Sequence, residues 1–62
     1  MFRMIELVGS SEKGFEEAIE SAIKELVAKG ERIHFFQVIE QRGSFRNNKV
    51  EYQVVIKVAV EA

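Results

Sequence analysis

Few side chains in this sequence could carry out covalent chemistry. The candidate nucleophiles are Ser10, Ser11, Ser21 and Ser44, and the only imidazole that could act as a base is His34. The chain has neither cysteine nor aspartate, so a nucleophile, a base and an orienting group are hard to assemble. No glycine-rich phosphate loop or metal-binding motif is present. The sequence therefore predicts a protein that is not an enzyme.

A different set of side chains is suited to holding a ligand. It combines one aromatic ring, three amides and two aliphatic groups: Phe35, Gln37, Ile39, Gln41, Gln53 and Val55. Alternate residues of a strand share one face of a sheet, so we expect these six to lie on the same face. Such a mixture is unusual for a surface that is left in water. We interpret this face as an interface with polar anchoring groups.

Three strands and one helix are expected to position these residues. Apolar and β-branched residues predict strands over residues 2–8, 33–45 and 50–60, with a turn centred on Asn47 and Asn48. Between the first two strands, apolar residues recur at helical spacing from Phe15 to Val27. Gly14 is the expected N-cap, and Gly30 follows the expected C-terminus. The order is β-α-β-β.

The expected helix can cover only one face of this sheet. We assign it the face with Tyr52, Val54, Ile56 and Val58, which Phe36 and Val38 of the second strand would join; this list is the more apolar side of the two strands. A strand with apolar side chains on both faces requires a cover on each. The face with Phe35 and Gln53 must therefore meet a partner chain, a ligand, or both.

Composition narrows the classes of function further. A chain of 62 residues makes one domain, residues 1–62, with a small core that self-association would stabilise. Nine Lys and Arg against ten Glu give a net charge of -1 with no basic block, which argues against nucleic acid as a partner. The N-terminal apolar segment is broken by Arg3 and Glu6 and is too short for a signal peptide or membrane span. We expect no membrane partner and a cytoplasmic location.

Four segments resemble motifs of one known family, the dodecins, which are small flavin-binding proteins of archaea and bacteria. Residues 5–11 (IELVGSS) are similar to V/I-E-L-V-G-T-S, and residues 14–18 (GFEEA) to S-W-E-E-A. Residues 35–43 (FFQVIEQRG) resemble W-F-E-V-V-E-Q-R-G, and residues 52–58 (YQVVIKV) resemble Y-Q-V-T-L-K-V. The four motifs occur in order over nearly the whole chain.

The resemblance implies an α+β fold in which a three-stranded antiparallel sheet is partly wrapped around one helix. It also implies a homo-oligomer of twelve copies in a hollow sphere, with flavin bound between subunits near two-fold axes. The family's flavin-stacking Trp corresponds to Phe35, and its flavin-binding Gln corresponds to Gln53. Gln37 and Val55, on the same expected face, complete the predicted binding set. The function implied is storage or sequestration of riboflavin or FMN.

Two positions depart from the family's pattern. Phe35 offers a smaller and less electron-rich stacking surface than Trp, and Glu61 stands where the family often has Arg, which disfavours a phosphate such as that of FMN. The alternative function is therefore a flavin-free oligomer that binds a cation such as calcium, or another small ligand. Carboxylates from several copies could complete a coordination shell, although the sequence does not single out a glutamate for it.

Overall fold

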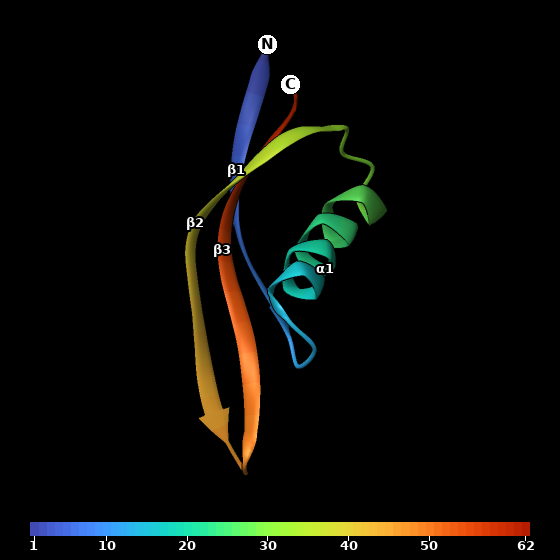
Figure 1. Cartoon of the computed structure of the whole chain (residues 1–62). Helices are drawn as coiled ribbons and strands as arrows, with labels where there is room; N and C mark the ends of the chain where they lie inside the picture. The colour runs from blue at the N-terminus through green and yellow to red at the C-terminus, as the bar shows by residue number, and fades with distance from the viewer.

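The computed structural model of the protein describes all 62 residues and has the predicted β-α-β-β order. Strand β1 spans Phe2–Ser11, helix α1 Phe15–Ala28, strand β2 Ile33–Arg46 and strand β3 Lys49–Glu61. The strands form an antiparallel sheet in the order β1-β3-β2, with β3 in the centre and α1 along one face (Figure 1). The predicted fold class is confirmed. Strand β1 is longer than predicted, because its ladder with β3 continues to the pair Ser11 and Tyr52.

The predicted turn and helix boundaries are also confirmed. Asn47 and Asn48 both have positive φ, 51° and 60°, which a tight hairpin turn requires and which asparagine tolerates. Gly14 is the N-cap of α1, and Gly30 has a φ of 87° just after the helix. The helix lacks the length and continuous hydrophobicity that crossing a membrane requires.

The hydrophobic core lies between α1 and the centre of the sheet. Its fully or almost fully buried members are Ala18, Ala22 and Leu26 from α1 and Val54, Ile56, Val58 and Val60 from β3. The helix closes tightly on the sheet because β1 has a glycine at the crossing point. A Cβ atom at Gly9 would collide with the backbone carbonyl oxygen of Ala18 and lie 3.0 Å from the Cβ of Ala22.

Helix α1 leaves most of β2 uncovered. Phe36 pairs with Val58 and Val38 pairs with Ile56, so both lie on the helix side of the sheet, as predicted. Their side chains nevertheless remain 45% and 36% exposed, so the expectation that they pack on the helix is wrong as regards burial. Beyond the end of β1, the β2–β3 hairpin continues past α1 as an extended arm (Figure 1).

Candidate ligand-binding face

The face of the sheet opposite α1, here called the open face, carries large apolar side chains in water. Cross-strand partners share a face, so the open face contains the residues paired with Gln53, Val55, Lys57, Ala59 and Glu61 of β3. Its exposed apolar members are Phe2 (52%), Met4 (48%), Val8 (57%) and Phe35 (50%). On the helix side of β3, by contrast, Val54, Ile56, Val58 and Val60 are fully buried, because α1 covers them.

All four predicted ligand-binding residues lie on the open face. On β2, Phe35 pairs with Ala59 and Gln37 pairs with Lys57. On β3, Val55 is paired with Val8 on one side and Glu40 on the other, and Gln53 is paired with Ser10 and Arg42. The structure does not bring them into one pocket. Phe35 is level with Ala59, and Ala59 is six residues from Gln53 along β3, which corresponds to about 20 Å at the usual rise of a strand.

A β-bulge corrects part of the predicted face. The register of β2 against β3 shifts between Val38 and Glu40, which leaves Ile39 as an extra residue. As a result Gln41 pairs with Val54 on the helix side, and the prediction that Gln41 lies on the open face is wrong. Glu40 and Arg42 take the open-face positions instead. The sequence indicates this shift only in one way: the polar residue Gln37 is at an odd-numbered position, whereas the alternating polar residues Glu40, Arg42 and Ser44 are at even-numbered positions.

One end of the open face, the amide end, consists of Arg42, Glu51 and Gln53. Arg42 donates a hydrogen bond from Nε to Oε1 of Gln53 over 2.9 Å, and Gln53 donates from Nε2 to Oε1 of Glu51 over 2.8 Å. Both ends of the Gln53 amide are therefore engaged, which fixes its orientation. The prediction of Gln53 as a hydrogen-bonding residue did not include Arg42 and Glu51, because neither partner is visible without the strand register.

The other end, the aromatic end, consists of Phe2, His34 and Phe35. The ring of Phe2 meets Phe35 edge to face, with centroids 5.6 Å apart and an interplanar angle of 88°, and lies 4.7 Å from the imidazole of His34. Such edge-to-face pairs orient the rings that form them. His34 is the extra residue of a second bulge, between Ile33 and Phe35. Phe35 is thus held by an aromatic neighbour and still presents a half-exposed ring.

Two further observations concern charge and nucleophiles near the aromatic end. Glu61 forms an ion pair with Arg32 at 3.2 Å, and its other oxygen lies 3.9 Å from Nε2 of His34. The serines of the open face, Ser10 and Ser44, pair with Gln53 and Glu51 at the opposite end of the sheet from His34. The single imidazole and these hydroxyl groups are therefore far apart within one chain.

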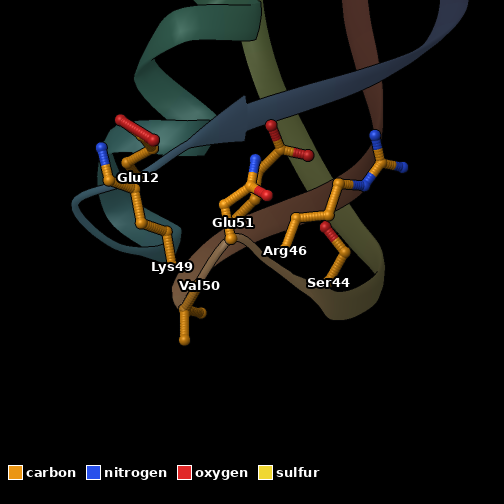
Figure 2. A pocket seen from close by; sticks show the side chains of 7 residues that line it. Glu12, Ser44, Arg46, Lys49, Val50 and Glu51 are labelled. Atoms are coloured by element: carbon orange, nitrogen blue, oxygen red, sulfur yellow. The ribbon is translucent and has the colours of Figure 1, made fainter.

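A separate polar pocket lies between the tip of the β2–β3 hairpin and the loop that follows β1 (Figure 2). Its volume is about 310 Å³, and it is lined by Glu12, Ser44, Arg46, Asn47, Lys49, Val50 and Glu51. Two carboxylates and two cations face the same space, yet they form no ion pair with one another. No group of three or more His, Cys, Asp or Glu side chains gathers in the chain.

Comparison with known proteins places this chain in one family. The Dodecin family model matches residues 1–62. A dodecin of Thermus thermophilus is 39% identical over 59 residues, which cover 94% of this chain and 86% of that protein. The chain therefore belongs to the dodecin family, whose members are small, oligomeric, ligand-binding proteins.

Two solved structures show how closely the fold is shared. A variant of the Thermus thermophilus dodecin with one tryptophan replaced by phenylalanine superposes with a TM-score of 0.89 at 39% identity, covering 97% of this chain and 91% of that one. A calcium dodecin of Mycobacterium tuberculosis superposes with a TM-score of 0.90 at 22% identity, covering 100% of this chain and 90% of the other. At the latter identity the similarity establishes the fold alone.

Proposed function

We propose that this protein binds a flavin, riboflavin in preference to FMN, between two of its copies and stores or sequesters it in the cytoplasm. The isoalloxazine ring of a flavin is flat and largely apolar, with a polar edge that both donates and accepts hydrogen bonds. A site for it needs an aromatic surface and an oriented amide. The open face has both, and the proposal assigns it binding without catalysis.

The observation that carries this proposal is the pairing of a half-exposed Phe35 ring with a fixed Gln53 amide on one face. Phe2 holds the ring edge to face, and Arg42 and Glu51 hold the amide at both ends. Ordering side chains before a ligand arrives reduces the entropy lost on binding. Both groups are therefore organised for a planar ligand with a polar edge.

Two copies are needed because the two groups are far apart in one chain. If two copies pack together through their open faces about a two-fold axis, each open face contacts the same face of the other copy, turned end for end. Phe35 of one copy then lies opposite the amide end of the other, with Gln37 and Val55 between them. This arrangement forms two equivalent sites for each pair of copies. It also covers the exposed apolar side chains of the open face, which supports a homo-oligomer, with twelve copies as the proposed number.

The choice of riboflavin over FMN rests on the charge of the aromatic end. Glu61 contributes a carboxylate there, and Arg32, the cation nearest to it, is already paired with it. A phosphate group near this position would meet a carboxylate whose neighbouring guanidinium is already paired, which disfavours its binding. Riboflavin has the same ring without the phosphate.

Fluorescence titration of riboflavin with the purified protein tests the proposal. We expect quenching that saturates, because a ring stacked on an aromatic side chain loses its emission, and we expect weaker binding of FMN. Phe35→Leu should abolish most of the quenching. Phe36→Leu is the matched control, since Phe36 is the adjacent residue with a similar exposure but lies on the helix side. Riboflavin that stays fluorescent at micromolar protein, with the fold intact by circular dichroism, would contradict the proposal.

The second candidate function is binding of a cation such as calcium. The observation that favours it is the presence of Glu12 and Glu51 in one polar pocket (Figure 2). Calcium takes about six to eight oxygen ligands, so two carboxylates of one chain would need more from neighbouring copies. Calorimetric titration with calcium, repeated with Glu12→Gln, tests it: no heat of binding, or the same heat in the variant, would remove this candidate.

A further inference from the structure

The only histidine of the chain lies within the aromatic end of the open face. His34 is the extra residue of the bulge between Ile33 and Phe35, and its imidazole lies 4.7 Å from the ring of Phe2. Phe2 in turn contacts Phe35 edge to face. The side chain of His34 is 40% exposed, so protons from solvent reach it. A titratable group therefore lies beside the ring on which the flavin is proposed to stack.

One carboxylate connects this imidazole to a cation. Nε2 of His34 lies 3.9 Å from one oxygen of Glu61, and the other oxygen accepts a hydrogen bond from Arg32 over 3.2 Å. Histidine ordinarily gains its proton between about pH 8 and pH 5. While His34 is neutral, the carboxylate and the guanidinium balance each other. Once His34 is protonated, two cations face one carboxylate, and the group of three side chains becomes net positive.

The other charges at this end of the sheet come as neighbours of opposite sign. They are Glu6 and Lys57 on the open face, Arg3 and Glu31 on the helix side, and the terminal amino group and carboxylate of Met1 and Ala62. Helix α1 packs on the opposite face of the sheet from His34 (Figure 1). Because each of these pairs is balanced, the proton on His34 decides the sign of the charge beside Phe35.

We propose that His34 sets the charge selectivity of the flavin site. Neutral His34 leaves the site selective for riboflavin, and protonated His34 admits flavins that carry a phosphate, such as FMN. The inference rests on the proposed function, in which a phosphate near the aromatic end meets Glu61. A protonated imidazole pairs with that carboxylate and supplies a cation for the phosphate. Riboflavin has no phosphate, so its affinity should change little with the same protonation.

Titration of the protein with riboflavin and with FMN, at pH 8 and at pH 5.5, tests this role. The quantity compared is the ratio of the two affinities, FMN over riboflavin, because effects on the shared ring cancel in it. Phosphate monoesters and amino termini also take up protons in or near this range, so His34→Gln is the reference variant. Lowering the pH should raise the ratio about three- to fivefold more in the wild-type protein than in His34→Gln, as expected for one partly exposed pair of charges.

A fixed charge separates the effect of the proton from that of the imidazole ring. His34→Lys should show the raised ratio already at pH 8. Gln41→Lys is the matched control, since it adds the same charge on the helix side and should leave the ratio at the wild-type value. Circular dichroism checks that each variant is folded.

Two results would overturn the role of His34. One is an equal response to pH in the wild-type protein and in His34→Gln, and the other is an equal ratio for the two lysine variants. If riboflavin binds at both pH values in these experiments, the proposed function stands and only the role of His34 is removed. Absence of riboflavin binding at both pH values would remove both.

Discussion

The two faces of the sheet are made by the same three strands but differ in what completes them. On the helix side of β3, Val54, Ile56 and Val58 are fully buried, because small residues of α1 and Gly9 of β1 allow close packing. On the open face, Phe2, Val8 and Phe35 of the flanking strands are about half exposed. The helix side is buried within the chain, whereas the open face exposes apolar side chains to solvent.

Because of this difference, we expect residues on one face to determine the stability of each copy and residues on the other to determine binding. Residues of the helix side are buried within the chain, so their substitution should change the free energy of unfolding of each copy. On the open face, the side chains of β1 and β2 and the Gln53 amide are organised by hydrogen bonds and ring contacts but are left accessible, so their substitution should change ligand affinity or assembly. Substitutions on the two faces should therefore differ in which of these quantities they change.

The largest effect is expected for Ile56→Ala in the core. Removal of a fully buried aliphatic side chain should lower the free energy of unfolding by about 2–5 kcal/mol, from lost burial and the cavity left behind. Urea denaturation at several protein concentrations measures this quantity and separates folding from assembly. The matched open-face variant, Val8→Ala, should cost the isolated chain less than about 1 kcal/mol. Equal losses in the two variants would remove the distinction between the faces.

A smaller effect is expected for Gln53→Leu at the amide end. The variant loses the oriented amide and leaves Arg42 and Glu51 without their shared partner, so riboflavin affinity should fall by about 1–3 kcal/mol. Gln41→Leu is the matched control, because the bulge places Gln41 on the helix side. Fluorescence titration of both variants gives the comparison. An equal loss in the Gln41 variant would contradict the assignment of the two glutamines to opposite faces.

Replacement of Phe35 by tryptophan should increase the affinity of the aromatic end for riboflavin. A larger and more electron-rich ring stacks better, so Phe35→Trp should strengthen riboflavin binding by about 0.5–1.5 kcal/mol. The same change at the neighbouring residue, Phe36→Trp, should leave the affinity unchanged because Phe36 lies on the helix side. Titration of the two variants under identical conditions decides between them. Unchanged affinity in the Phe35 variant would count against Phe35 as the stacking residue.

The smallest effect is expected for Phe2→Leu. This change keeps an apolar side chain but removes the edge-to-face contact that orients Phe35, so riboflavin affinity should fall by about 1 kcal/mol or less. Met4→Leu is the control, since Met4 lies on the same face of β1 and is not one of the rings paired with Phe35. A measurable loss in the Phe2 variant alone supports its positioning role, and equal affinities would refute it.

Most of the fold could be predicted because the sequence patterns that specify the helix and the turn involve residues close together in the chain. The helical spacing of apolar residues gave the position of α1, and Asn47 and Asn48 gave the hairpin turn. The dodecin resemblance gave the strand arrangement, which the comparisons support across the whole chain. Alternation along β3 also assigned its two faces correctly.

The candidate site was less predictable, because it depends on register. The bulge at Ile39 moved Gln41 to the helix side and brought Arg42 opposite Gln53, and no local rule specifies a one-residue insertion in a strand. The contact between Phe2 and Phe35 joins residues from β1 and β2, which are not neighbours in the sheet, so spacing along the chain could not reveal it. The exposure of Phe36 likewise depends on how far one helix extends across the sheet.

We propose that a second copy of this chain completes the open face. Multi-angle light scattering coupled to size-exclusion chromatography, at micromolar protein and without added flavin, tests it most directly. We expect a single assembly whose mass is a multiple of 7.1 kDa, with twelve copies as the proposed number. A stable species of 7.1 kDa, folded by circular dichroism, would show that the open face needs no partner and would contradict the proposed contact between copies.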